Sequence, residues 1–328
     1  QGRSELLLEK NWKFTREDNN EFIKPAFDDS KWQSVTVPHD WAIYGPFSSL
    51  NDKQEVAISQ DGQKEAMEHA GRTGGLPFVG VGWYRTEFDV PQFQAGKRAT
   101  ILFDGAMSHA NVYINGQKVG YWPYGYNSFH FDITKYLKPG EKNTLAVRLE
   151  NLPESSRWYP GAGLYRNVHL IITEDAYIPV WGTYITTPSV NEKFAKVNVR
   201  TKVVLPEGAD PAKYSVETSV WNPNKQKLTA VRTSLAQMKY NNNQAEQEFV
   251  IQAPSLWSPE MPALYSAETR LYEGDKLKDI YTTPFGIRSI EIIPDKGFFL
   301  NGKRTVFKGV CNHHDLGPLG AAVNDAAI

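Results

Sequence analysis

The chain has 328 residues, of which 41% are hydrophobic, 22% charged and 12% aromatic, and its formal net charge is −1. This length predicts about two to three domains with a sizeable core. Basic and acidic residues are mixed along the chain, which argues against nucleic acid or an anionic membrane as a partner and favours neutral partners such as sugars. The single Cys311 excludes an intrachain disulfide, and no run of about 18 apolar residues predicts a membrane span.

The chain starts at Gln1 without a charged and then apolar leader. An export signal has therefore been removed or never existed. The sequence leaves two compartments for the protein, outside the cytoplasm after export or inside the cytoplasm, and it slightly favours export.

Short alternating runs separated by turn residues fill residues 86–173 and predict β-strands. Asn115-Gly116 predicts a tight hairpin, so we expect antiparallel pairing and a double-sheet sandwich over residues 1–176. The runs that predict these strands are 98–103, 111–114, 118–121, 144–149 and 167–172, with earlier strands at 10–14 and 32–37.

A second strand series, in residues 177–284, predicts an immunoglobulin-like sandwich. This strand series contains no cluster of reactive side chains, so we expect the second sandwich to act as a spacer. The runs that predict its strands are 196–201, 214–220, 247–251 and 265–271.

A long glycine-rich segment separates the early strands from residue 83. A loop of this length, residues 45–82, is uncommon unless it is functional or disordered. Residues 64–70 predict a short helix within it. We interpret the segment as an arm or lid, with a mobile surface loop as the alternative.

The last part of the chain pairs a hairpin signal with a group of polar residues. Two apolar runs, 298–300 and 306–310, flank Asn301-Gly302, which predicts a hairpin. Asn312, His313, His314 and Asp315 follow directly. Polar groups that cluster just past a buried strand usually line a site.

Four sequence blocks span nearly the whole chain. They are Pro38-His39-Asp40-Trp41, Gly82-Trp83-Tyr84-Arg85 with the later Asn115-Gly116, residues 156–168, and residues 309–315. Taken together and in this order, the blocks resemble the glycoside hydrolases of family 2, the β-galactosidase, β-glucuronidase and β-mannosidase superfamily.

The resemblance implies a mainly β fold in three parts. These are a jelly-roll sugar-binding sandwich over residues 1–176, an immunoglobulin-like sandwich over residues 177–284, and, over residues 285–328, the hairpin and first strand of an incomplete (β/α)8 barrel. The ends of barrel strands are where such active sites are built.

By resemblance, the substrate-binding residues are Asp40, Arg157, His313, His314 and Asp315. Asp40 would reach the hydroxyls of the terminal sugar, since an ionised acceptor binds hydroxyl donors strongly. Arg157 would brace Asp40 or face the sugar, and His313 would bind the sugar at the end of the first barrel strand.

Each of these residues also has a purely structural interpretation. Asp40 could be a turn or capping carboxylate, Arg157 a surface ion-pair partner and His313 a structural histidine. Trp41, Trp83 and Trp158 could fill the core.

We expect no metal and no cofactor. Adjacent residues such as His313, His314 and Asp315 cannot easily converge on one ion, and no second ligand cluster follows. Many family members carry Arg where Asn312 stands, so the hydrogen bonding beside His313 is expected to differ from theirs.

The family mechanism is retaining and needs two glutamates, an acid/base and a nucleophile. By resemblance both come from later barrel strands, beyond Ile328. Asn20-Glu21 and Asn191-Glu192 lie in the sandwiches and match nothing in the family. The 328-residue chain alone is therefore expected to be inactive.

The leading hypothesis is the N-terminal part of an exo-acting β-galactosidase that hydrolyses terminal β-galactosides. A β-glucuronidase or β-mannosidase of the same superfamily is the alternative within this class, and a non-catalytic carbohydrate-binding module is the alternative from another class. The expected partner is a carbohydrate, and a homo-oligomer remains open.

Overall fold

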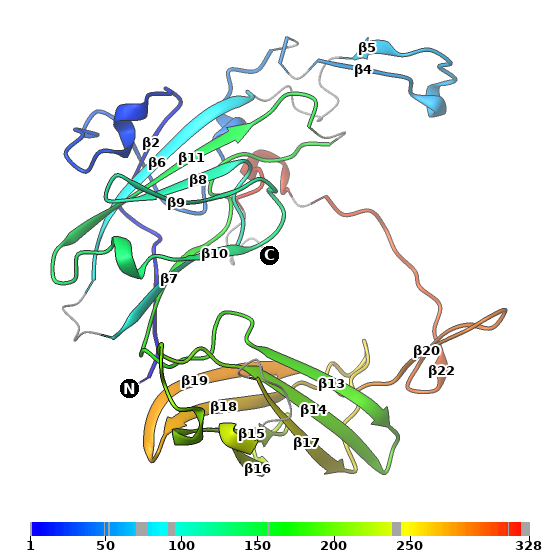
Figure 1. Ribbon diagram of the computed structural model, residues 1–328. Coiled ribbons are helices and arrows are strands. Elements are labelled where there is room, and N and C mark those ends of the chain that lie inside the picture. The colour runs from blue at the N-terminus through cyan, green and yellow to red at the C-terminus, as the bar shows by residue number, and fades with distance from the viewer. Residues whose placement is uncertain are drawn as a thin grey trace. The chain divides into compact units, whose positions relative to one another are not determined.

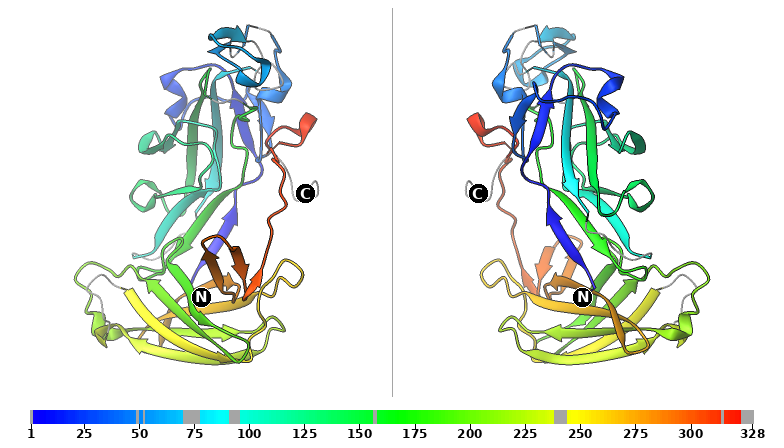
Figure 2. Two further views of the ribbon diagram at one scale, coloured as in Figure 1. Left: turned by 90° about the vertical axis from the view of Figure 1, so that its right-hand side faces the viewer. Right: turned by 90° about the vertical axis from the view of Figure 1, so that its left-hand side faces the viewer.

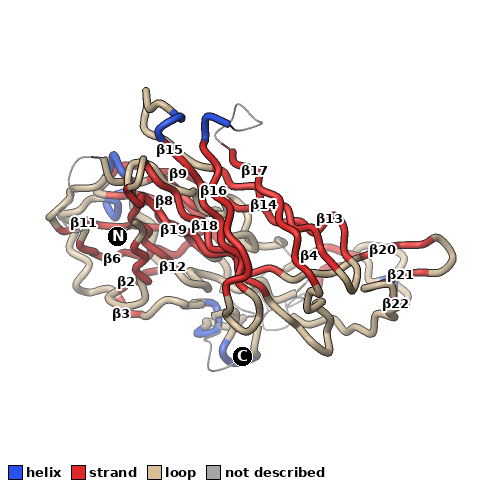
Figure 3. Tube along the Cα trace, turned by 90° about the horizontal axis from the view of Figure 1, so that it is seen from below, coloured by secondary structure: helices blue, strands red, loops and turns tan. Residues whose placement is uncertain are grey.

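The computed structural model describes residues 2–48, 50–51, 53–69, 78–90, 96–155, 158–237, 244–313 and 315–322. The chain forms two compact units. The first sandwich comprises Glu5–Ile172 with Cys311–Ile328, and the second comprises Gln1–Ser4 with Thr173–Val310. Strands dominate both units, and the helices are short turns (Figure 3). The predicted mainly β fold is confirmed.

The first sandwich is a jelly-roll with two principal antiparallel sheets, whose strands are labelled in Figure 1. One sheet has the order β1-β12-β7-β10, with β1 Ser4–Leu7, β12 Val168–Thr173, β7 Arg98–Phe103 and β10 Phe129–Asp132. The other has the order β3-β2-β6-β11-β8-β9, with β3 Gln33–Val35, β2 Trp12–Thr15, β6 Gly80–Asp89, β11 Lys142–Asn151, β8 Ala110–Ile114 and β9 Gln117–Trp122.

The core of this sandwich follows from the alternation along its strands. In β7 the buried positions include Ile101 and Phe103, and in β8 they include Val112 and Ile114. Side chains on alternate positions point to the same face of a sheet, so both strands bury one face in a shared cluster. The ring of Phe103 stacks on Phe129 of the neighbouring strand at 4.8 Å.

The hairpin predicted at Asn115-Gly116 is confirmed and connects β8 to β9. Asn115 has φ 50° and Gly116 has φ 81°. A two-residue turn with positive φ at both positions matches the twist of the flanking strands, and asparagine followed by glycine tolerates this conformation best.

The second sandwich has the predicted immunoglobulin-like arrangement of two facing sheets (Figures 1 and 2). One sheet has the order β13-β14-β17, with β13 Thr183–Val190, β14 Phe194–Lys202 and β17 Gln244–Gln252. The other has the order β16-β15-β18-β19, with β16 Lys227–Ser234, β15 Tyr214–Trp221, β18 Tyr265–Glu273 and β19 Lys276–Phe285.

Three of these strands had no sequence signal. Edge strand β16 is mostly exposed and shows no alternation. The edge strands β13 and β19 contain Pro188 and Pro284, and the register of β13 shifts between Thr186 and Ser189. Proline cannot donate to a sheet and is tolerated on edges, which hides such strands from a periodicity argument.

A buried ion pair fixes the start of the chain to the second sandwich. Arg3 Nη2 lies 2.9 Å from Oδ2 of Asp279, which is fully buried. The same carboxylate accepts hydrogen bonds from the backbone amides of Ile178 at 2.8 Å and Ile280 at 2.9 Å. A buried charge needs this number of donors to offset its loss of hydration.

The helix predicted at residues 64–70 is wrong. Met67–His69 forms β5, which pairs with β4, Gln54–Val56. Lys53 Nζ lies 2.9 Å from Glu68 Oε1 across this hairpin. A helix of two turns is marginal in water, whereas pairing satisfies the backbone of both short strands. The part of the predicted lid at residues 70–77 lies outside the described residues.

The predicted hairpin at Asn301-Gly302 is confirmed, with φ 51° and 74° at the two positions. It belongs to a small sheet of β20 Ile290–Ile293, β21 Gly297–Leu300 and β22 Lys303–Arg304. Residues 305–313 form no strand, and Phe307 and Val310 are 74% and 85% exposed. A barrel strand is stabilised by pairing on both sides, and the described residues offer this segment no partner strand.

Every helical turn in the described part of the chain is of the 3₁₀ type. They are η1 Asn20–Ile23, η2 Ala42–Tyr44, η3 Ser59–Asp61, η4 Thr134–Tyr136, η5 Pro211–Lys213, η6 Leu235–Gln237 and η7 Gly317–Leu319. None of the described helices has the length and apolar character needed to cross a membrane.

Candidate functional site

Asp40 lies at the centre of a buried polar group in the first sandwich. It follows β3 and precedes η2, and its Oδ1 accepts a hydrogen bond from the Ala42 amide at 3.0 Å. An aspartate that bonds the amide two residues ahead stabilises a tight turn. Asp40 therefore acts as a turn residue through its Oδ1 atom.

The other oxygen of Asp40 is held by distant parts of the chain. Oδ2 accepts hydrogen bonds from the Tyr159 hydroxyl at 2.5 Å and from the Ala321 amide at 2.9 Å. Asp40 is only 1% exposed. Burial raises the pKa of its carboxyl, and the hydrogen bonds from Ala321, Tyr159, Ala42 and Ala162 act in the opposite direction.

The C-terminal segment of residues 315–322 reaches Asp40 because Gly320 has no side chain. Gly320 has φ +62°, and a Cβ placed on it would lie 2.5 Å from Asp40 Oδ2. Only glycine combines this backbone conformation with so close an approach. Figure 2 shows the red turn of η7, just before Gly320, against the side of the first sandwich.

His39 is buried beside Asp40 as a neutral imidazole. Its Nδ1 lies 2.7 Å from the Tyr84 hydroxyl, and its Nε2 has no hydrogen-bond partner among the described residues. Burial, with a smaller effect from the Arg16 charge, lowers the pKa of His39 to about 4. The imidazole therefore remains uncharged near neutral pH.

Gly163 makes a second close approach in this region. A Cβ on it would lie 2.4 Å from the Tyr84 hydroxyl oxygen and 2.5 Å from the His39 carbonyl oxygen, and its φ is +100°. Gly163 and Met107 exchange backbone hydrogen bonds of 2.9 and 3.0 Å. The backbone beside His39 is therefore tied to the loop that contains Met107.

The predicted site residues have different outcomes. Burial raises the pKa of the Tyr159 hydroxyl. The nearby negative charges of Asp40 and Asp315 raise it further. His313 is exposed, two residues before Asp315. Arg157 and His314 lie outside the described residues, so their predicted roles stay predictions.

Of the residues that hold Asp40, Tyr159 and Ala321 were not predicted as such from the sequence. Tyr159 stands in the block 156–168, so the resemblance contained a signal for it. The contact of Ala321 is made by a backbone amide, and no side-chain pattern could have pointed to it.

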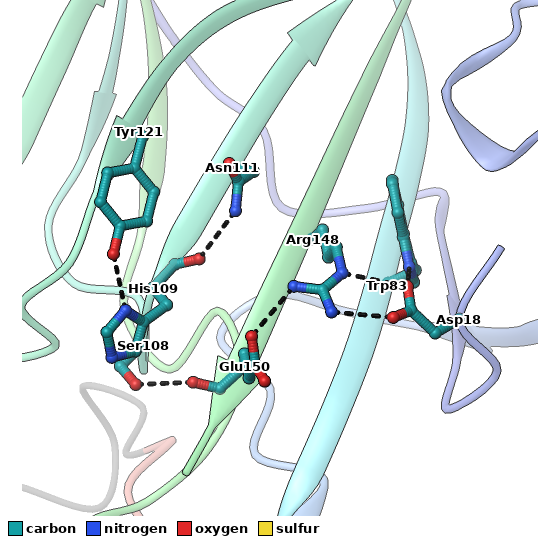
Figure 4. A network of polar contacts seen from close by, with 8 residues as sticks. All are labelled: Asp18, Trp83, Ser108, His109, Asn111, Tyr121, Arg148 and Glu150. Atoms are coloured by element: carbon teal, nitrogen blue, oxygen red, sulfur yellow. Dashed lines mark hydrogen bonds and ion pairs between the residues drawn. The ribbon is translucent and has the colours of Figure 1, made fainter. Parts of the chain in front are cut away.

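The outer face of the six-stranded sheet carries a polar network that braces the loop at residues 107–109 (Figure 4). Ser108 Oγ donates to the Glu150 carbonyl oxygen at 2.7 Å, and the Glu150 carboxylate lies 3.2 Å from Arg148. Arg148 also pairs with Asp18 at 2.8 Å. The hydrogen bond from Arg148 is the main cause of the lowered pKa of Asp18.

The same network covers a buried tryptophan. Trp83 Nε1 donates to Asp18 Oδ1 at 2.8 Å, and Trp83 and Trp41 are 1% and 0% exposed. The core interpretation of these two tryptophans is confirmed. Trp158 differs, because 43% of its surface is exposed.

Carboxylates suit the recognition of sugar hydroxyls, because charged acceptors bind hydroxyl donors more strongly than neutral ones do. Asp40 and Asp315 both lie near the Tyr159 hydroxyl, and both oxygens of Asp40 accept hydrogen bonds from the protein. Among the described residues, His, Cys, Asp and Glu form no group of three that could hold a metal ion.

Two sequence models of one protein family match most of the chain. Residues 6–174 match "Glycosyl hydrolases family 2, sugar binding domain", and residues 177–288 match "Glycosyl hydrolases family 2". The chain belongs to glycosyl hydrolase family 2.

Similar family 2 proteins include enzymes of two named specificities. The chain is 40% identical to Beta-galactosidase BoGH2A of Bacteroides ovatus over 97% of its own length and 35% of that protein. It is 31% identical to a Beta-glucuronidase of Bacteroides fragilis, over 98% of this chain and 43% of that protein.

A solved family 2 structure from Bacteroides cellulosilyticus superposes with a TM-score of 0.85 at 34% identity. The match covers 98% of this chain and 40% of that one. The chain thus spans less than half the length of these relatives.

Proposed function

We propose that this chain forms the N-terminal part of a retaining exo-β-glycosidase that removes terminal β-galactosides from oligosaccharides or glycans. The 40% identity to Beta-galactosidase BoGH2A over nearly the whole chain carries this proposal. The buried polar group around Asp40 supports it, because Asp40 and Tyr159 lie within residues 6–174, which match the sugar binding domain of the family.

In this proposal the sugar is cleaved by two glutamates that lie beyond Ile328. One protonates the glycosidic oxygen, while the other, about 5 Å away, forms a glycosyl-enzyme that water then releases. Because the proposal assigns both glutamates to the part of the enzyme that follows the sandwiches, we expect the 328-residue chain alone to hydrolyse nothing.

Asp40, Arg157, His313, His314 and Asp315 are proposed to bind the sugar from the side of this chain. Both oxygens of Asp40 are engaged by protein donors. Direct contact with a sugar hydroxyl therefore requires the Ala321 amide to leave Oδ2. Until then Asp40 acts by positioning Tyr159 and the segment that holds Asp315.

The test begins by sequencing the gene past the codon for Ile328 and expressing the complete reading frame. We expect the longer protein to hydrolyse p-nitrophenyl β-galactoside faster than p-nitrophenyl β-glucuronide. Faster cleavage of the glucuronide would favour the β-glucuronidase alternative, which the 31% identity to the Bacteroides fragilis enzyme supports. A natural stop codon at Ile328 would leave a carbohydrate-binding module as the function.

A further inference from the structure

Three aromatic side chains gather in the first sandwich, and one of them, Trp158, directly precedes Tyr159, which donates a hydrogen bond to Asp40. Tyr124 and Trp158 are 54% and 43% exposed, and Tyr126 is partly buried and less exposed than either. Trp158 Nε1 donates to the Tyr126 hydroxyl at 3.0 Å, and the rings of Tyr124 and Tyr126 meet edge to face at 5.6 Å. We call these three residues the aromatic platform.

The aromatic platform is held in place by the loop that carries it. The carbonyl oxygen of Gly125 accepts a hydrogen bond from the Tyr165 hydroxyl at 2.8 Å, and that of Pro123 accepts one from the His109 amide at 3.1 Å. A Cβ on Gly125 would lie 2.2 Å from the sulfur of Met107, so the loop lies directly on that side chain. A surface fixed in this way loses little entropy when a ligand binds.

Two connections join the aromatic platform to Asp40. Trp158 directly precedes Tyr159, whose hydroxyl donates to Asp40. Tyr126 packs against the cluster that contains Ala321, whose amide donates to the same carboxylate. A ligand that extends from Asp40 towards Trp158 and Tyr126 would therefore meet aromatic rings.

We propose that the aromatic platform binds the second sugar of a β-linked oligosaccharide whose terminal sugar lies at Asp40. The faces of aromatic rings carry negative partial charge and attract the polarised C–H groups on the face of a pyranose. Small-molecule sites combine such apolar surfaces with a few placed polar groups, here supplied by the Asp40 group. This inference rests on the proposed function and adds the sugar next to the scissile bond.

The test uses the 328-residue chain labelled with ¹⁵N and follows its tryptophan indole signals by NMR. The probes are disaccharides with a β-linked terminal galactose or glucuronic acid, compared with the two monosaccharides. We expect a disaccharide, and neither monosaccharide, to shift the Trp158 indole signal, which Trp158→Phe identifies by its loss. Trp158→Ala and Tyr124→Ala should each weaken disaccharide binding about tenfold, and Trp158→Phe should retain most of it.

Trp181→Ala is the matched control, because Trp181 is 58% exposed and lies in the second sandwich. It should leave binding unchanged. Unchanged binding in both Trp158→Ala and Tyr124→Ala would overturn the inference, as would the absence of any disaccharide shift at Trp158. This experiment measures binding and not hydrolysis. If the longer protein hydrolyses β-galactosides but the aromatic platform does not respond to disaccharides, this inference is refuted and the proposed function is retained.

Discussion

Tyr159 donates its hydroxyl hydrogen to Oδ2 of Asp40 across 2.5 Å, although 119 positions separate the two residues in the sequence. Tyr159→Phe removes this donor from a carboxylate that is 1% exposed. We expect the variant to lower the free energy of unfolding of the first sandwich by about 2 kcal/mol at neutral pH, because the buried charge loses a strong partner. Protection of the β6 and β11 amides against hydrogen exchange measures this loss.

The control for this prediction is the same change in an Asp40→Asn background. There Tyr159→Phe should cost less than half as much, since no buried charge depends on the hydroxyl. The cost should also shrink in acid, because burial raises the pKa of Asp40 and the protonated carboxyl needs less stabilisation. An equal cost in both backgrounds would show that the hydroxyl does not act through Asp40.

His39 makes the first sandwich less stable as the pH falls. Its folded pKa of about 4 lies below the unfolded value of 6.5, so the unfolded chain takes up the proton first and the folded state loses stability through this window. Between pH 7.5 and pH 5 the loss should be about 2 kcal/mol. Hydrogen exchange at the two pH values, in parallel on His39→Gln, measures it.

In His39→Gln the loss of folding stability between pH 7.5 and pH 5 should be smaller by about 2 kcal/mol, because the variant lacks the imidazole that takes up the proton. Tyr84, Tyr44 and Arg16 surround His39 and are unchanged in the variant. An identical pH dependence in both proteins would assign the effect to other groups.

The ion pair between Arg3 and Asp279 should stabilise the second sandwich far more than a surface pair does. Arg3→Ala leaves a fully buried carboxylate with only its backbone donors, and we expect a loss of about 3 kcal/mol. The control is Lys196→Ala, which breaks an exposed pair with Glu248 in the same sandwich and should cost less than about 1 kcal/mol. Urea unfolding of the second sandwich compares them, and similar losses would refute the prediction.

Gly320→Ala should detach the segment of residues 315–322 from Asp40. The new Cβ would lie 2.5 Å from Asp40 Oδ2 and from Ile43 Cγ2. Gly317→Ala is the matched control, because Gly317 also has positive φ but nothing within 4 Å of a Cβ. We expect the Ala321 amide to lose its hydrogen-exchange protection in Gly320→Ala and to keep most of it in Gly317→Ala. Full protection in Gly320→Ala would contradict the geometry.

The sequence predicted those parts of the fold that depend on local pattern. The strands at 98–103 and 111–114 alternate cleanly, and the hairpins at Asn115-Gly116 and Asn301-Gly302 depend on two residues each. Edge strands with proline gave no such signal. The helix predicted at residues 64–70 failed because cross-strand pairing with Gln54–Val56 outweighed local propensity.

The sequence predicted only those residues of the site whose side chains stand in the four blocks that resemble the family. Asp40 stood out through its block, and its turn role follows from the next two residues. Its contacts with Tyr159 and Ala321 are made across 119 and 281 positions. Long-range contacts of this kind depend on the folded backbone, above all on the close approach of Gly320.

The most direct test of the central claim is the hydrolysis of p-nitrophenyl β-galactoside by the complete protein, with the anomeric form of the first sugar product followed by NMR. We expect release of β-galactose, as a double displacement requires, and no hydrolysis by the 328-residue chain. Release of α-galactose, or cleavage by the short chain alone, would contradict the proposal that a retaining galactosidase is completed by glutamates beyond Ile328.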